Sequence, residues 1–217
     1  MAERNIKARA NKIISILSKT YPRARIALEY KTDFELVAAT ILSAQSTDKQ
    51  VNKITPALFK RFKTINDFAQ ADINELETMV HSTGFFRNKA KNIKAAAQEI
   101  LERFGGKVPD NMNDLITLPG VARKTANVVL FNAFGKNEGI AVDTHVRRLS
   151  QRLGLTKNDD PNKIEIDLMA IFPKKLWGKI TYYLIEHGRV VCDAKKPKCG
   201  ICPVAKLCPS CRIYLSK

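Results

Sequence analysis

One lysine lies in a setting that predicts covalent chemistry. Lys124 follows the sequence Leu-Pro-Gly-Val-Ala-Arg at residues 118–123 and precedes an apolar segment, residues 125–134. The Pro-Gly pair predicts a helix, a tight hairpin and a second helix that begins just after Gly120. The unpaired N–H groups and positive dipole end of that second helix suit a phosphate oxygen. Beside Arg123 and this helix end, the neutral, nucleophilic form of the Lys124 amine is favoured. The alternative is an ordinary turn with a solvated lysine.

The five cysteines predict a metal centre. All fall between Cys192 and Cys211, and an odd number crowded into one segment of a chain without a secretory signal argues against disulfides. Four of them are spaced C-x6-C-x2-C-x5-C, namely Cys192, Cys199, Cys202 and Cys208, while Cys211 lies outside the pattern. Four thiolates in a short loop can hold a tetrahedral zinc ion or an iron–sulfur cluster, and C-x2-C pairs most often mark zinc. The spacing alone leaves both metals open.

Three further residues have both a structural and a functional interpretation. Asp143 stands where a helix N-cap belongs, and capping alone would explain an aspartate there. Gln45 opens a polar break at residues 45–48, and an N-cap for the following helix explains this break at least as well as a functional role does. Phe85 lies between Gly84 and a basic stretch at residues 87–94. A single aromatic residue is more often part of the core, but this basic setting also suits insertion into a DNA base stack.

The charge balance indicates a polyanionic partner. The chain has 217 residues, with 37 Lys and Arg against 21 Asp and Glu, a formal net charge of +16 and a pI near 9.8. This excess favours nucleic acid first and an anionic membrane surface second. Lys195, Lys196 and Lys198 lie between the first two metal-ligand candidates, and no acidic residue follows Asp193, so we expect this loop to contact phosphates. No apolar run is long enough to span a bilayer, which predicts a soluble cytoplasmic protein.

The elements that must position these residues all read as helices, because no convincing β alternation occurs. Apolar periodicity, caps and breakers predict helices at residues 6–17, 34–44, 51–62, 74–81, about 88–104, 111–117, 125–134, 144–153, 161–172 and 176–188. Thr32 and Glu35 fit a capping box for the second of these. That helix is apolar around most of its circumference, so we expect it to be the buried centre of the fold.

Taken in order, these motifs resemble the endonuclease III branch of the helix-hairpin-helix DNA glycosylase superfamily. The resemblance rests on the hairpin with Lys124, on Asp143 placed 19 residues later (143 − 124), and on the four-cysteine loop. It reverses the preference for zinc and implies a [4Fe–4S] cluster on the four spaced cysteines. It also implies two all-α lobes: residues 26–136 as a helical barrel domain with the hairpin, and residues 1–25 plus 137–217 as an iron–sulfur cluster domain. The active-site cleft would lie between them.

The activity implied by this resemblance is that of a bifunctional DNA glycosylase and apurinic/apyrimidinic lyase acting on oxidised pyrimidines in base excision repair. Lys124 would be the nucleophile and Asp143 would support the cationic transition state. The partner would be double-stranded DNA with a damaged base or abasic site, bound by a monomer in the cytoplasm at the bacterial nucleoid. Other residues would bind the DNA: Gln45, Phe85, Gly120, Ala122, Arg123, Lys195, Lys196 and Lys198.

Two departures from the family pattern and two rival functions bear on this interpretation. The family often has a leucine where Phe85 stands, and its hairpin usually has a glycine where Ala122 stands. Because alanine supplies the same N–H group as glycine, we predict a negative φ at Ala122. An adenine-specific glycosylase would usually lack the hairpin lysine and carry an extra C-terminal domain. A non-catalytic DNA-binding module would not cleave an abasic site.

Overall fold

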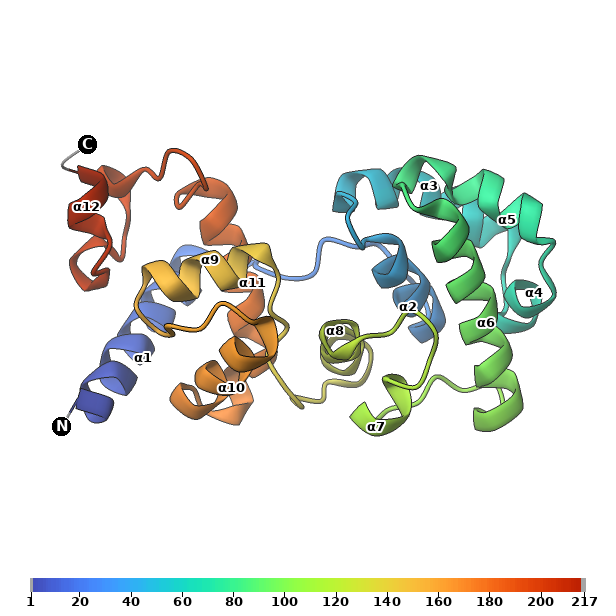
Figure 1. Cartoon of the computed structure of the whole chain (residues 1–217), viewed down its shortest axis with the longest axis horizontal. Helices are drawn as coiled ribbons and strands as arrows, with labels where there is room; N and C mark the ends of the chain where they lie inside the picture. The colour runs from blue at the N-terminus through green and yellow to red at the C-terminus, as the bar shows by residue number, and fades with distance from the viewer. Residues whose placement is uncertain (1, 216–217) are drawn as a thin grey trace. The chain divides into compact units, whose positions relative to one another are not determined.

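All regular secondary structure in the described residues is helical. A computed structural model describes the backbone of residues 2–215 and the side chains of residues 5–214, and no strand occurs among them (Figure 1). The predicted all-α class is therefore confirmed. Within this described part, no helix is long and apolar enough to cross a membrane. The chain divides into two compact units, residues 27–136 and residues 1–26 together with 137–217.

The continuous unit, residues 27–136, is built around one buried helix. Its elements are α2 (Asp33–Leu42), α3 (Asp48–Arg61), α4 (Ile65–Gln70), α5 (Ile73–Val80), the 3-10 helix η1 (His81–Thr83), α6 (Phe86–Phe104), α7 (Met112–Leu115) and α8 (Arg123–Phe134). Every residue of α2 from Leu36 to Leu42 is buried, because the helix is apolar on all sides. The prediction of a buried central helix is confirmed, although it ends at Leu42, and Ala44 is exposed.

Local caps determine where these helices begin. The Thr32 hydroxyl accepts a hydrogen bond from the backbone N–H of Glu35 at 3.2 Å. The Glu35 carboxylate, however, accepts from the backbone N–H of Lys31 instead of that of Thr32, so the predicted capping box is only half formed. A complete box occurs at Thr64 and Asp67, where it starts the short helix α4. The sequence pattern did not predict α4, since six residues show too little periodicity.

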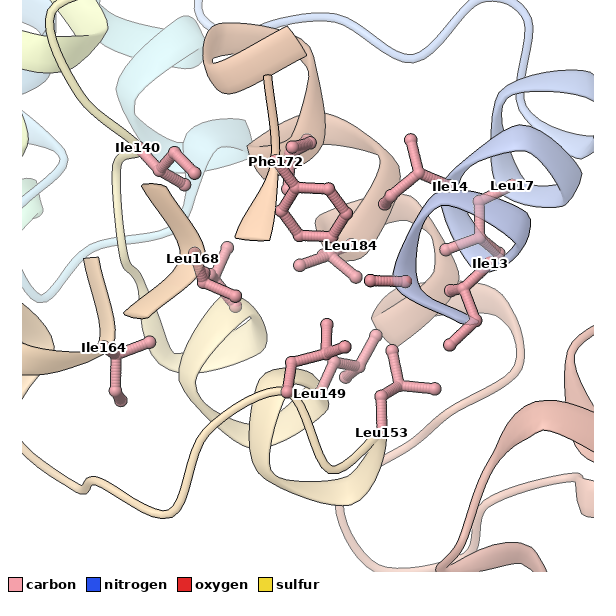
Figure 2. Close-up of a cluster of buried hydrophobic side chains, with 14 of the residues drawn as sticks. Ile13, Ile14, Leu17, Ile140, Leu149, Leu153, Ile164, Leu168, Phe172 and Leu184 are labelled. Carbon is pink, nitrogen blue, oxygen red and sulfur yellow. The ribbon is translucent and has the colours of Figure 1, made fainter. Parts of the chain in front are cut away.

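The second unit combines the two ends of the chain. Its elements are α1 (Ala2–Thr20), α9 (Thr144–Arg152), α10 (Pro161–Ile171), the 3-10 helix η2 (Lys174–Leu176), α11 (Trp177–Val190), the 3-10 helices η3 (Cys199–Ile201) and η4 (Ala205–Leu207), and α12 (Cys211–Leu215). Figure 2 shows apolar side chains from α1, α9, α10 and α11 meeting in one core. Val204 of the cysteine-containing loop is 1% exposed and belongs to the same core.

Hydrogen bonds also join the first helix to the cysteine loop. The Arg9 guanidinium donates to the carbonyl oxygens of Gly154 at 2.9 Å and Leu207 at 3.0 Å. It donates as well to the carbonyl oxygen of Leu153, the residue after α9. Because these carbonyls belong to a helix end and to a loop, one side chain satisfies acceptors that would otherwise lack partners. The loop is thus fixed to the same unit through both apolar packing and Arg9.

Candidate functional site

The hairpin is formed by α7, a turn and α8. Leu118 and Val121 are buried at the two ends of the turn, and the Val121 N–H donates to the Leu118 carbonyl at 3.0 Å. The carbonyl of Ala122 accepts the first bond of α8, from the N–H of Ala126 at 2.9 Å. The two buried residues hold the turn in the core while the start of α8 lies at the surface. The predicted helix–hairpin–helix geometry is confirmed.

Gly120 is required by packing inside the unit as well as by its backbone. Its φ is +79°, in the left-handed region that favours glycine. A Cβ built at this position would lie 2.9 Å from the Cβ of Asn92 on α6. The backbone at Gly120 thus lies close to α6, and this close approach fixes the hairpin turn against that helix.

Ala122 is the N-cap residue of α8, and its φ of −83° confirms the predicted negative value. No side-chain hydrogen bond caps this helix, in contrast to the threonine, asparagine and aspartate caps of α2, α3, α4, α5, α7, α9 and α10. The first N–H groups of α8 thus lack the side-chain acceptor that serves those helices. Arg123 and Lys124 follow directly and are exposed. This helix end combines backbone donors with two cations.

Asp143 caps α9 in the other unit. One carboxylate oxygen accepts from the backbone N–H of Val146 at 2.8 Å, and the side chain is half-buried. The cap predicted from the sequence is confirmed. A carboxylate has a second oxygen, so a cap of this kind is compatible with a further role of the same side chain.

Gln45 and Phe85 share an unusual backbone conformation. Their φ angles are +53° and +50°, and among the described residues no others except glycines have a positive φ. Both side chains are exposed, and Phe85 is 64% exposed. The alternative that Phe85 belongs to the core is therefore wrong. Its neighbour Phe86 packs instead, with its ring centroid 4.4 Å from that of His81.

The cysteine loop forms a pocket lined by thiols. All five cysteines are free, and all five line one pocket between the ends of α9 and α11 and the loop. The Arg152 guanidinium reaches the Cys192 sulfur at 3.4 Å, and the carbonyl oxygens of Asp193 and Ala194 at 2.7 Å each. The His187 Nε2 lies 3.5 Å from the sulfur of Cys202. Arg152 belongs to no recognisable sequence motif, so its role in holding the cysteine loop was not predicted.

The donor set fits an iron–sulfur cluster. Among residues 5–214, no three Cys, His, Asp or Glu side chains converge as ligands of a single ion would. In a cubane cluster each thiolate binds a different iron, so thiols spread around a pocket suit that group. Burial, with neighbouring thiolates adding to it, raises the pKa of Cys199 to about 11, and burial also raises the pKa of Cys202 and of Cys208. Deprotonated thiols here need a bound cation, which iron provides.

The lysines of the loop are at the surface, where they are accessible to a phosphate. Lys195, Lys196 and Lys198 are exposed, and the Asp193 carboxylate accepts from the backbone N–H groups of Lys195 at 2.8 Å and Lys196 at 3.0 Å. The single acidic residue of this segment therefore organises the loop that presents the lysines. In the other unit, Lys89 differs from the basic residues near it because it is buried. Sequence pattern alone did not indicate this burial, since Lys91 and Lys94 follow Lys89 closely and carry the same charge.

Comparisons with known proteins identify a family for both parts of the chain. The HhH-GPD superfamily of base excision DNA repair proteins matches residues 38–174. The iron–sulfur binding domain of endonuclease III matches residues 192–208, from the first to the last of the four spaced cysteines. The chain is similar to endonuclease III of Synechocystis sp. (58% identity over 94% of this chain and 93% of that protein) and of Bacillus subtilis (44% identity, 87% and 86%).

Solved structures agree in fold. A non-covalent endonuclease III–DNA complex has a TM-score of 0.93 at 40% identity and covers 97% of this chain and 99% of that chain. A trapped covalent intermediate of endonuclease III with DNA, in an estranged-adenine complex, has a TM-score of 0.92 at 40% identity, covering 96% and 98%. One of these proteins was thus captured bound to DNA and another was captured covalently attached to it.

Proposed function

The chain belongs to the endonuclease III family, and we propose which of its residues carry out the family's reaction. The protein is a DNA glycosylase and apurinic/apyrimidinic lyase of base excision repair, with DNA as its partner and an iron–sulfur centre at its C-terminal loop. What we propose is the assignment of individual residues to each step of this reaction. The observation that carries it is the exposed Lys124 amine in the first turn of α8, where no side chain caps the helix.

Lys124 is the nucleophile. Its Nζ attacks C1′ of the damaged nucleoside and the N-glycosidic bond breaks, so that the base leaves with the bonding electrons. Loss of a proton from nitrogen and opening of the sugar give a Schiff base. Loss of a C2′ proton then expels the 3′ phosphate by β-elimination, and water releases the lysine. A glycosylase that used only activated water would have no need of an amine at this position.

Asp143 stabilises the transition state. Departure of the base leaves positive charge on the sugar, which a carboxylate close to it stabilises electrostatically. The same group can take a proton from the attacking amine. The oxygen that caps α9 holds the carboxylate in place, and the other oxygen is the one we assign to this chemistry.

The DNA backbone is held by the uncapped end of α8. The turn residue Gly120, the cap residue Ala122 and Arg123 present backbone N–H groups, a helix dipole and a cation to one phosphate. Lys195, Lys196 and Lys198 add positive charge from the cysteine loop. These contacts carry no base specificity but set the register of the protein on the duplex.

Gln45 and Phe85 replace the extruded base. A base cannot be attacked at its sugar while it is stacked in the duplex, so it must be flipped out at a cost of a few kcal/mol. Exposed side chains on strained backbone positions are suited to insertion because the surrounding loops already hold them outward. An exposed phenylalanine can stack on the neighbouring bases.

The two compact units correspond to two functional domains. Residues 27–136 form the helical barrel domain with the hairpin, and residues 1–26 with 137–217 form the iron–sulfur cluster domain, one residue from the predicted boundary at 25/26. Cys192, Cys199, Cys202 and Cys208 would hold a [4Fe–4S] cluster, whose iron–thiolate bonds fix the basic loop. The protein acts on oxidised pyrimidines, as a monomer, in the bacterial cytoplasm at the nucleoid.

Borohydride trapping tests the assignment of Lys124. The protein is incubated with duplex DNA that contains one abasic site or thymine glycol, and borohydride reduces the Schiff base to a stable adduct. We expect the wild type to form a covalent complex that maps to Lys124 by peptide sequencing. Lys124→Gln should still bind the DNA but form no adduct and leave the strand intact. Unimpaired trapping by Lys124→Gln would remove this residue from the mechanism.

A further inference from the structure

Lys89 is a buried ammonium group that joins two separate segments. Its side chain is 4% exposed, although it lies near the start of α6 among exposed basic residues. Its Nζ donates hydrogen bonds to the carbonyl oxygen of Leu42 at 2.7 Å and to that of Thr83 at 2.8 Å. The two acceptors are 41 residues apart in the chain (83 − 42). A buried lysine is rare unless its charge is compensated.

Both carbonyls belong to the ends of helices. Leu42 is the last residue of α2, and Thr83 is the last residue of η1. Carbonyl groups at helix C-termini lack intrahelical donors, and they form the negative end of the helix dipole. An ammonium group with three donors suits two such acceptors at once. Burial lowers the pKa of Lys89, so these carbonyls must offset the cost of holding the charge.

The two helix ends lead directly into the proposed wedge residues. Gln45 comes three residues after Leu42, and Phe85 comes two residues after Thr83. Both have the strained positive φ described above, and such conformations persist only where their surroundings hold them. A further contact anchors the two loops from the far side of Gln45, because the side-chain amide of Gln50, in α3, donates to the Ser82 hydroxyl of η1 at 2.6 Å.

We propose that Lys89 is a positioning residue for base flipping: it fixes the Gln45 and Phe85 loops relative to one another so that both side chains enter the duplex together. This inference rests on the proposed wedge roles of Gln45 and Phe85. Lys89 does not touch the DNA itself. It acts through the two loops, so its removal should impair insertion into the base stack and should leave the chemistry of Lys124 intact.

The experiment follows insertion directly. A duplex carries an uncleavable tetrahydrofuran abasic analogue with 2-aminopurine as the opposing base, whose fluorescence rises when it is unstacked. Lys89→Met removes the ammonium and keeps an apolar side chain of similar length. Lys94→Met is the matched control, because Lys94 lies on the same helix and its Nζ donates to a single carbonyl, that of Ala71, at 2.8 Å. All measurements use protein with its cluster, well below each variant's melting temperature.

With saturating protein, we expect Lys89→Met to lose at least two thirds of the fluorescence rise and to bind the duplex about tenfold more weakly. Lys94→Met should stay within twofold of the wild type in both. Hydrogen exchange should show faster amide exchange at residues 43–47 and 81–85 together in Lys89→Met, and near residue 71 alone in Lys94→Met. A gain in exchange at only one of the two loops, or a full fluorescence rise in Lys89→Met, would overturn the proposal.

Two further variants separate this inference from the wedge assignment. If Phe85→Ala and Gln45→Ala retain the full fluorescence rise, the proposed wedge roles fail. If they lose it while Lys89→Met retains it, only the positioning role of Lys89 fails. Should Lys89→Met not fold, Lys89→Gln takes its place, since its neutral amide keeps two N–H donors but is one atom shorter. We expect at least a threefold loss of the fluorescence rise, and wild-type behaviour would reject the role of the ammonium.

Discussion

The carboxylate of Asp143 allows a structural role and a catalytic role to be measured separately. Asn caps a helix about as well as Asp, because its side-chain oxygen accepts the same hydrogen bond. Asp143→Asn should therefore keep the bond to the Val146 N–H and change the free energy of unfolding by less than about 1 kcal/mol. Its turnover on a duplex with one oxidised pyrimidine should fall by roughly 10²- to 10⁴-fold, because the negative charge is gone. Thermal melting and single-turnover kinetics measure the two effects. Near-normal turnover would leave Asp143 as a cap only.

At the same scale, sequence reasoning could identify reactive residue types but not their exposure. The position of Asp143 before an apolar periodic segment was sufficient to predict its cap. The sequence left undecided whether the Phe85 side chain is buried or exposed. Its exposure depends on a positive φ, which no neighbouring residue type requires. Lys89 lies among other lysines, and only the packing of α2 and η1 on α6 shows that it is buried. Such facts depend on tertiary contacts.

At the scale of the element, the N-terminus of α8 has no side-chain cap, and we propose that a DNA phosphate binds there. Ala is among the poorest N-cap residues, and replacing it with Ser or Asp should stabilise the protein by about 0.5–1 kcal/mol. Ala122→Asp should nevertheless bind abasic-site duplex at least tenfold more weakly, because its carboxylate repels the phosphate and occupies the N–H groups. Ala122→Ser is the control, with a similar gain in melting temperature and a smaller loss of affinity. Equal affinity of Ala122→Asp and the wild type at the same salt concentration would show that no phosphate binds this helix end.

Most of the longer elements were predictable from local signals at their ends, whereas the six residues of α4 were missed despite the capping box at their start. Thr47 and Asp160 cap α3 and α10, and the glycine that follows α6 closes it in the left-handed conformation. The predicted start of α6 was late by two residues, because Phe85 serves as a cap without a side-chain hydrogen bond. The helix α12 was not predicted, since its five residues follow directly on the cysteine loop and offer no periodic pattern.

At the scale of the whole molecule, the two units should respond differently to loss of the cluster. Val204 and Leu207 tie the cysteine loop to the core of the unit that contains α1, α9, α10 and α11. The helix α2 belongs to the other compact unit, residues 27–136. Cys202→Ala should therefore remove the iron, about four atoms in the wild type, and with it the brown colour of the cluster. Amide exchange should become faster in the unit that contains α1, α9, α10 and α11. Exchange in residues 27–136 should change little.

The fifth cysteine provides the control for this experiment. Cys211 is buried and lines the same pocket, but it lies outside the spacing of the other four. Cys211→Ser should retain the iron content and the exchange pattern of the wild type. Stoichiometric zinc in protein purified without air would contradict the cluster assignment. Faster exchange throughout both units in Cys202→Ala would show that the fold depends on the cluster as a whole.

The contact between Gly120 and Asn92 has a consequence for how this protein can change in evolution. Asn92 lies seven residues after Phe85, about two turns along α6, so one helix sets the spacing between the hairpin and the exposed phenylalanine. Inserting or deleting one residue between these positions would rotate Phe85 by about 100° relative to the hairpin. The segment between Phe85 and Asn92 should therefore keep a constant length even where its side chains diverge.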